Sequence, residues 1–396
     1  MFKNIFKNKL LIITPILALA IVFIFSLTLF PTVQPQPENL PVAIVNEDEG
    51  VEIPDQPAVN MGQTIMDMAQ TASEPVAGED PAVKWIVVDN AEAVQEGMNN
   101  QEYYAALVIP ADFSAKQASL RTDTPSSPEL QIYVNQGMNA AAANMAAQVL
   151  NGMVDNINNN VRTQLLEGFE AQGATLTVEQ AASIAVPITK TVTNVNEVGE
   201  NSAGGNAPVS LFQPLWIACL ASSAILFIAV SKMTISNRKE KLASKIAQII
   251  MGALVALFIG FGLTWLAEAM VGLNIPDFTD TALFLSITAF SFILMILAVL
   301  SLIGFKGIAL FALLLFFGAP LLAMAPEMMS AFYRDWIYPW LPMRFMIEGL
   351  REIFYFGQGL VWNTPLSVLV WIGVVSLIVI LLTALKRTKS KSEATS

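Results

Sequence analysis

The residue types in this 396-residue chain exclude most forms of side-chain catalysis. The chain contains no histidine and a single cysteine, Cys219, which lies in an apolar segment. Without histidine there is no Ser-His-Asp or Cys-His nucleophile pair and no His-ligated metal site. The sequence also lacks the G-x-x-x-x-G-K-[ST] phosphate-binding loop, so we expect it to hydrolyse no ATP of its own. We therefore predict a protein that is not an enzyme and has no cofactor.

One acidic segment has the composition of a calcium-binding loop but not its pattern. Asn46-Glu47-Asp48-Glu49-Gly50 closes an apolar, strand-like run. The regularly spaced ligands and the terminal glutamate of an EF-hand are missing. We therefore predict a solvated turn and no metal site.

The most regular charged pattern is formed by Arg344, Glu348 and Arg351. Their spacing of i, i+4 and i+7 places them along one face of a helix, where opposite charges pair. The pattern predicts an extracellular amphipathic helix over residues 342–357. The apolar residues that share another face of this helix are Met346, Ile347, Leu350, Ile353 and Phe354. Two interpretations remain open: the helix rests on the outer leaflet, or it dips between subunits and caps the exit of a pathway.

Six apolar segments must position these residues. The length of each segment is close to the ~20 residues that a helix needs to cross a bilayer. They are residues 10–30, 211–230, 246–267, 282–303, 308–325 and 365–385. The first follows three lysines and is longer than the ~7–15-residue apolar region of a signal peptide. We therefore expect it to be a retained anchor.

The charges between the apolar segments predict the direction in which the chain crosses the membrane. Residues 31–210 carry 23 Asp and Glu against 5 Lys and Arg, whereas the segments assigned to the other side carry 13 Lys and Arg against 2 Asp and Glu. Positively charged flanks stay in the cytoplasm. We predict a multi-pass protein of the cell (plasma) membrane with both termini cytoplasmic and residues 31–210 extracellular.

The predicted fold is a polytopic α-helical membrane protein with six transmembrane helices and an extracellular α/β domain inserted between the first and the second. The predicted divisions are a cytoplasmic N-terminal elbow at 1–9, the first transmembrane helix at 10–30, the α/β domain at 31–210, a five-helix membrane domain at 211–385 and a basic cytoplasmic tail at 386–396. No feature of the charge pattern indicates nucleic-acid binding.

Within residues 31–210, short apolar runs and turn residues predict an α/β arrangement. The predicted strands are 42–46, 85–89, 103–109 and 130–135. Residues 137–170 are predicted to form one long helix, because apolar residues recur every three to four positions and form a seam along it. The residues of this seam are Met138, Ala142, Met145, Val149, Met153, Ile157, Val161, Leu165 and Phe169. This helix packs either on the strands of its own domain or on a second copy of itself. Residues 171–209 are expected to be polar helix and loop.

Two features of the apolar segments bear on packing and on energy supply. Gly252, Ala256 and Gly260 form a small-xxx-small ladder that permits close approach of helices, either within the chain or at a dimer seam. No ionisable residue lies at mid-membrane depth in the predicted spans. Such residues mark proton and ion relays, so their absence argues against a proton- or sodium-driven transporter.

Several segments, taken in order, resemble the YhgE/Pip (phage infection protein) family and the related type-2 ABC export permeases. The segments are Leu40–Gly50, Tyr103–Ser114 with its I-P-x-D-F-S element, Tyr133–Gly137, Ala207–Trp216 and Leu341–Arg351. Residues 31–210 are shorter than the coiled-coil-rich outer region of many YhgE/Pip proteins, which favours the compact permease end of that family.

The resemblance implies a permease half that forms a homodimer in the lipid bilayer and works with a separate ATP-binding cassette subunit. That subunit would dock on cytoplasmic residues, here Phe2 and Phe6 of the N-terminal elbow and Lys239 and Lys241 of a predicted cytoplasmic loop, Ser231–Lys245. The permease would move an amphipathic or lipid-linked substrate, a drug or a peptide outward. The alternative is a cell-surface receptor or assembly protein, for phage adsorption or secretion, without transport activity.

Overall fold

A computed structural model describes residues 37–385, except 53–57, 74, 76–79, 174 and 236, together with Leu19 and Phe23. The described chain forms two compact units. The predicted elbow at 1–9, almost all of the predicted span at 10–30 and the tail at 386–396 lie outside the described residues.

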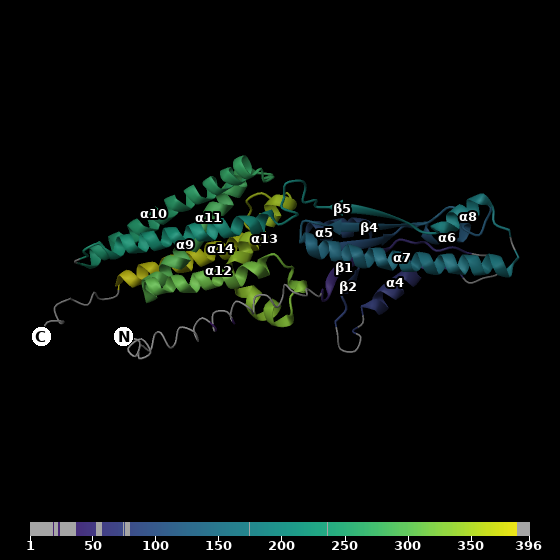
Figure 1. The fold of residues 1–396 in the computed structure, drawn as a ribbon, viewed down its shortest axis with the longest axis horizontal. Coiled ribbons are helices and arrows are strands. Elements are labelled where there is room, and N and C mark those ends of the chain that lie inside the picture. Colours follow the sequence, from purple (N-terminus) through teal and green to yellow (C-terminus); the bar gives the residue numbers. More distant parts are fainter. Residues whose placement is uncertain are drawn as a thin grey trace, which may run out of the picture. The chain divides into compact units, whose positions relative to one another are not determined.

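The first unit, the helical unit, contains Gly199–Ala323 and the chain from Ser330 onward. The second, the α/β unit, contains Gln36–Val198 and the short segment Met324–Met329. Figure 1 shows the helices of the helical unit and the sheet of the α/β unit with the helices that cover it.

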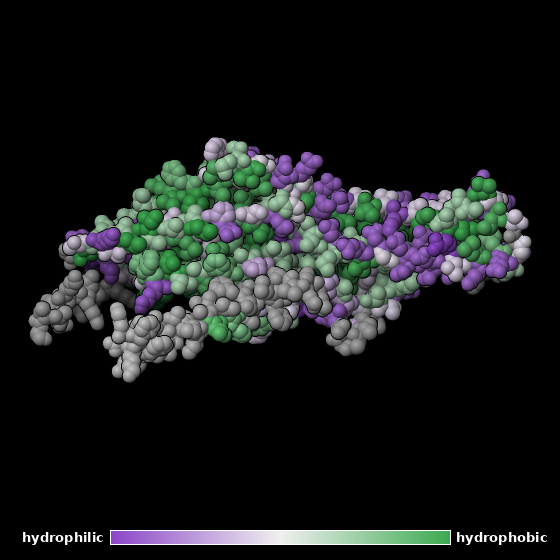
Figure 2. Space-filling view, in the orientation of Figure 1, coloured by the Kyte–Doolittle hydropathy of each residue, from purple (hydrophilic) through white to green (hydrophobic). Residues whose placement is uncertain are grey.

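Among its described residues, the helical unit contains five helices that are long and apolar enough to cross a membrane, and they match the last five predicted spans. They are α9 Ala207–Ser231, α10 Arg238–Trp265, α11 Phe278–Ile303, α12 Ile308–Leu322 and α14 Thr364–Leu385. A π-helical turn, Leu266–Val271, extends α10. Apolar side chains cover much of the visible surface over these helices (Figure 2), as expected for segments that face lipid.

Helix α11 is buried along most of its length, and α10 packs closely against it. The buried positions of α10 recur every three to four residues and include the predicted ladder Gly252, Ala256 and Gly260. A Cβ on Gly260 would lie 2.5 Å from the Ser286 nitrogen and 2.6 Å from the Ala282 oxygen. The ladder therefore packs within the chain, and this face of α10 is not free to form a dimer seam.

Helix α9 contacts α11 through small polar side chains. Cys219 Sγ donates to the Ala289 oxygen at 3.7 Å, and Ser223 Oγ donates to the Ile293 oxygen at 3.4 Å. One turn earlier, Trp216 is fully buried and its indole nitrogen donates to the Phe311 oxygen of α12 at 3.2 Å. These bonds give each buried polar group a partner where no water is present.

The α/β unit is built on a mixed sheet with strand order β2-β1-β3-β4-β5. The strands are β1 Leu40–Asn46, β2 Val83–Val87, β3 Ala105–Ile109, β4 Glu129–Asn135 and β5 Thr189–Val195. Strand β1 pairs in parallel with β2 and β3, β3 pairs antiparallel with β4, and β4 pairs in parallel with β5.

The four predicted strands are all present, with bounds shifted by up to two residues at either end. Strand β5 was not predicted, because residues 171–209 were expected to be helix and loop. Its sequence, Thr-Lys-Thr-Val-Thr-Asn-Val, is exposed along almost its whole length. An edge strand that buries neither face carries no alternation of apolar and polar residues, so the usual strand signal is absent.

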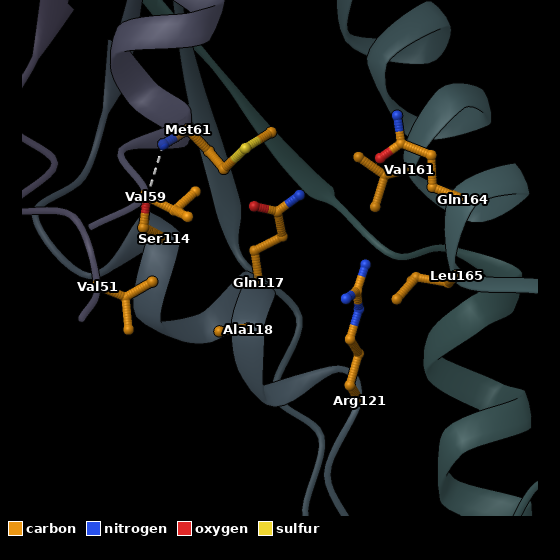
Figure 3. Close-up of a pocket in the computed structure, with 10 residues that line it drawn as sticks. All are labelled: Val51, Val59, Met61, Ser114, Gln117, Ala118, Arg121, Val161, Gln164 and Leu165. Carbon is orange, nitrogen blue, oxygen red and sulfur yellow. Dashed lines mark hydrogen bonds between the residues drawn. The ribbon is translucent and has the colours of Figure 1, made fainter. Parts of the chain in front are cut away.

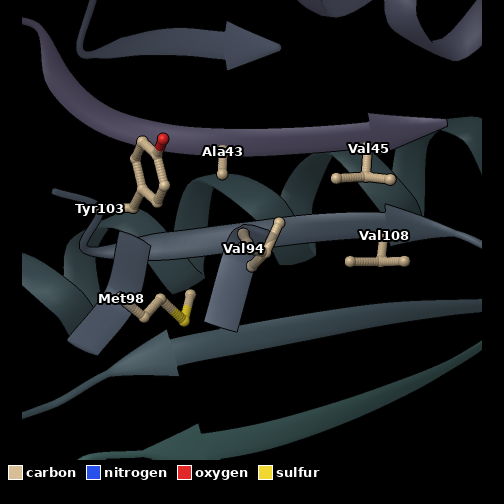
Figure 4. Packing of buried hydrophobic residues seen from close by; sticks show 7 residues of the cluster. Ala43, Val45, Val94, Met98, Tyr103 and Val108 are labelled. Carbon is tan, nitrogen blue, oxygen red and sulfur yellow. The ribbon is translucent and has the colours of Figure 1, made fainter. Parts of the chain in front are cut away.

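Helices cover the sheet, and both faces of its central strands are buried. The helices are α4 Met61–Ala72, α5 Ala91–Asn99, α6 Phe113–Ser119, α7 Ala140–Ala171 and α8 Val178–Ala185. Figure 4 shows Val94 and Met98 of α5 packed against Ala43 and Val45 of β1 and Val108 of β3. The alternate residues of β1 and β3 are buried as well, as in α/β sheets covered on both faces.

Helix α7 confirms the predicted long helix and contacts β1, β3 and β4 of its own unit. The predicted seam is only partly correct. Ala142, Ile157, Val161 and Leu165 are buried, but Leu150 and Val154 are buried in place of the predicted Val149 and Met153. The sheet therefore covers the apolar face that was considered for pairing with a second copy.

The acidic turn after β1 is not a fully solvated turn, because Asp48 is buried. Its carboxylate accepts from the backbone nitrogens of Gly62 at 3.0 Å and Ser114 at 2.9 Å, in the first turns of α4 and α6. It also accepts from the Ser114 hydroxyl, whose oxygen in turn accepts from the Met61 nitrogen at 2.8 Å. A carboxylate between two helix N-termini satisfies free N–H groups and matches the positive ends of both dipoles.

The segment Met324–Met329 packs in the α/β unit, although residues of the helical unit precede and follow it in sequence. Glu327 accepts from the Tyr104 hydroxyl at 2.8 Å, and its backbone oxygen accepts from the Glu38 nitrogen at 2.8 Å. Met328 and Met329 are buried. No sequence pattern indicated this docking, because it joins residues that lie more than two hundred positions apart.

The packing of α10 on α11 is tested by Gly260→Ala. The added methyl group meets α11 backbone atoms that cannot move aside, so we expect a loss of about 1–3 kcal/mol in stability, measured by thermal unfolding in detergent. Gly262→Ala is the matched control, since a Cβ there meets nothing within 4 Å. Equal unfolding temperatures for the two variants would contradict this packing.

The buried carboxylate is tested by Asp48→Ala. This change leaves the N–H groups of Gly62 and Ser114 without an acceptor, so we expect a loss of about 3 kcal/mol in the stability of the α/β unit. Glu49→Ala is the control, because Glu49 is exposed next to it in sequence. Proteolytic susceptibility of β1 and α4 that is unchanged in Asp48→Ala would argue against this role.

Candidate functional site

The predicted amphipathic helix before the last span is α13, Pro342–Tyr355. Proline at its first position is compatible with a helix start, where the missing N–H needs no partner. A π-helical turn, Tyr333–Ile337, and a 3₁₀ turn, Tyr338–Trp340, precede it.

Helix α13 is packed inside the helical unit rather than lying on its surface. It contacts α9, α11, α12 and α14. Gly349 faces Phe284 of α11 so closely that a Cβ there would lie 2.6 Å from a ring carbon. This burial does not fit a helix that rests on a leaflet with one face exposed.

The structure brings Arg344 and Glu348 of the predicted charge stripe together. Arg344 Nε lies 3.6 Å from Glu348 Oε1, an ion pair longer than a hydrogen bond. The guanidinium also lies over the rings of Tyr338 and Phe345, 5.2 Å and 4.5 Å from their centroids. Such stacking favours a partly buried guanidinium cation.

Arg351, the third residue of the stripe, is buried and interacts electrostatically with Glu348. Burial raises the pKa of Glu348, and the charges of Arg344 and Arg351 and a hydrogen bond from Tyr338 oppose that rise. The three side chains therefore form one cluster in which Arg351 is buried and Arg344 and Glu348 are half-buried.

Glu352, which the sequence reasoning did not single out, connects α13 to α14. Its carboxylate accepts from the Asn363 side-chain amide, and the Asn363 side-chain oxygen accepts from the Leu366 nitrogen at 2.9 Å, in the first turn of α14. Burial raises the pKa of Glu352. The available signal was its position four residues after Glu348, which places both acids on one helix face.

The predicted docking residues Lys239 and Lys241 lie in the first turn of α10. Asn237 caps this helix, because its side-chain oxygen accepts from the Glu240 nitrogen at 2.9 Å and its amide donates to the Glu240 carboxylate at 2.9 Å. Basic side chains near a helix N-terminus are opposed by the helix dipole. Helix stability therefore does not explain the basic residues here. Phe2 and Phe6 lie outside the described residues.

Lys245 was predicted to belong to a loop, but it lies in the second turn of α10 and is buried. Its ammonium donates to Ser301 of α11 at 2.8 Å and to Gln248 at 3.2 Å. The predicted loop of residues 231–245 therefore shortens to residues 232–237, because helical structure begins at Arg238.

No group of three or more His, Cys, Asp or Glu residues suitable for a metal ion occurs in the described ranges. The sequence profile of the ABC-2 family transporter proteins matches residues 9–385.

The chain belongs to this family. ABC-2 proteins are multi-pass membrane components of transporters and normally work with an ATP-binding subunit. A stretch of 125 residues, 32% of this chain, is 30% identical to the ESX secretion system protein YueB of Bacillus subtilis (strain 168). The match spans only 11% of that protein's length. No solved structure matches the chain.

The charge cluster of this ABC-2 protein is tested by Glu348→Ala. Removing the acid takes away the counter-charge of the half-buried Arg344 and the buried Arg351, so we expect a loss of about 2 kcal/mol in stability, measured by thermal unfolding. The control is Asp335→Ala, which breaks the exposed pair with Arg334 and costs less than about 1 kcal/mol. A Glu348→Ala protein as stable as the control variant would show that the cluster has no structural role.

Proposed function

We propose that this protein is the permease subunit of an ABC-type exporter of the YhgE/Pip kind, with ATP hydrolysis supplied by a separate subunit. The observation that carries the proposal is the family match over residues 9–385, on a chain whose described residues include five helices long and apolar enough to cross a membrane and whose sequence has no phosphate-binding loop. Energy that drives transport must then come from another protein.

The ATP-binding subunit docks at the basic start of α10, around Lys239 and Lys241. Three features support this placement: Lys239 is exposed, the dipole of α10 disfavours the basic residues, and the charge pattern assigns this end to the cytoplasm. Phe2 and Phe6 complete the docking surface. Residues 31–210 lie on the extracellular side, and the first span at 10–30 anchors them there.

Two copies of the permease assemble in the bilayer, and an amphipathic or lipid-linked substrate, a drug or a peptide moves outward between them. The cluster of Arg344, Glu348 and the buried Arg351 supports a role for α13 near the outer end of that pathway. A charge in a packed helix costs free energy when its partner is removed, so the ion pairs stabilise one arrangement of the helix. A gating element needs such a defined arrangement.

A second candidate is a component of a secretion assembly that does not itself transport. The 30% identity to the ESX secretion system protein YueB favours it. Such a component would purify with other membrane proteins of its assembly and without an ATP-binding cassette subunit.

The docking proposal is tested by purifying the tagged protein from its own membranes and assaying co-purified ATPase activity. We expect Lys239→Ala with Lys241→Ala to reduce that activity by about tenfold or more, because both cationic contacts are lost. Lys84→Ala, at an exposed position in the α/β unit, is the control and retains the activity.

Two outcomes would count against the proposals. ATPase that remains bound to the double variant would exclude this docking site. A wild-type preparation without any ATP-binding cassette subunit would favour the secretion candidate.

A further inference from the structure

The α/β unit contains a cavity of about 450 Å³ whose lining combines apolar walls with polar side chains. Figure 3 shows it between the end of α6 and the helix α7. Val161 and Leu165 of α7 form one wall, and Val51 and Val59, which are bridged to each other, contribute to the other. This volume is within the ~300–1,000 Å³ of small-molecule sites.

Three side chains supply the unused hydrogen-bonding groups of this cavity: Gln117, Arg121 and Gln164. Across the described ranges none of the three makes a side-chain hydrogen bond or ion pair. Ser114 also lines the cavity, but its hydroxyl is already engaged by Asp48 and by the Met61 nitrogen. Groups available to a ligand are therefore two amides and one guanidinium.

Arg121 is exposed, and it and Lys84 are the two basic residues of this unit that have no side-chain partner among the described residues. Residues 31–210 contain only 5 basic residues against 23 acidic ones. Lys116 pairs with Asp112, Lys190 pairs with Asp155, and Arg162 donates to Asn159. Arg121 instead projects toward Leu165 beside Gln117 (Figure 3).

Apolar surface continues past Arg121 along α7. A smaller pocket of about 30 Å³ shares Arg121 and Leu165 and adds Gly168, Phe169 and Gln172. An anionic group on the guanidinium would thus have apolar surface for its hydrocarbon part, mainly on Val161, Leu165 and Met61.

We propose that this cavity binds a small amphipathic anion, with its carboxylate or phosphate held by Arg121 and its aliphatic part against Val161 and Leu165. Arginine recognises both kinds of oxyanion through paired N–H groups. The two glutamines lie on either side and can donate to the remaining oxygens. The site goes beyond the transport proposal, because binding here requires neither an ATP-binding subunit nor movement across the membrane.

The test uses the full-length protein in lipid nanodiscs and equilibrium dialysis of radiolabelled octanoate, with empty nanodiscs subtracted. We expect saturable binding of octanoate, and binding of acetate or octanol that is at least about tenfold weaker, because each lacks one of the two recognised parts. Octyl phosphate distinguishes a general oxyanion site, which binds it as well as octanoate, from a site selective for carboxylates.

Arg121→Gln is expected to weaken octanoate binding by about tenfold or more, and Arg121→Lys to retain most of it, because the charge is kept. Arg162→Gln is the matched control, since Arg162 is exposed on α7 and lies outside the cavity lining. Hydrogen exchange that slows at residues 113–121 and 161–169 upon octanoate addition places the ligand in this cavity.

Octanoate binding equal in Arg121→Gln and wild type would overturn the proposal. So would the absence of saturable binding above empty nanodiscs. Since Arg121 has no partner in the described chain, Arg121→Gln should unfold at the wild-type temperature. If it does not, Ala118→Phe provides a second test, because a larger side chain fills the cavity and should abolish binding.

Discussion

Close approach of the neighbouring helices to α11 is the constraint on which the helical unit depends. Gly260 of α10, Gly349 of α13 and Gly373 of α14 each meet α11 where a side chain would collide or be crowded. Lipid tails are as apolar as the helices, so the hydrophobic effect does not favour helix association in a bilayer. Van der Waals contacts at short range and hydrogen bonds from small polar side chains must stabilise the association instead. The buried α13 and its charge cluster are held in place by this packing.

The five apolar helices could be predicted because a membrane span has a strong and local signal, about twenty apolar residues in a row. Four strands and the long helix α7 were predicted for a similar reason, since buried elements repeat apolar residues at a fixed period. Strand β5 was missed because it is a polar edge strand. Some buried positions of α7 were predicted one residue away from those observed. The helix carries apolar residues on more than one face, and more than one set of them recurs every three to four positions.

The candidate site was predictable only in part. The spacing of Arg344, Glu348 and Arg351 indicated one helix face, but not that the helix is buried, because burial depends on the four helices around it. Asp48 was expected to be solvated, since nothing local shows that Ser114 and Gly62 fold onto it. The carboxylate of Asp48 joins the acidic turn to Ser114 of the I-P-x-D-F-S element.

The claim that this ABC-2 protein works with energy supplied by another subunit is tested most directly by native mass spectrometry of the complex released from its own membranes. The expected result is two copies of this chain bound to two copies of an ATP-binding subunit. A complex that contains this chain alone, or only with proteins that bind no ATP, would contradict it.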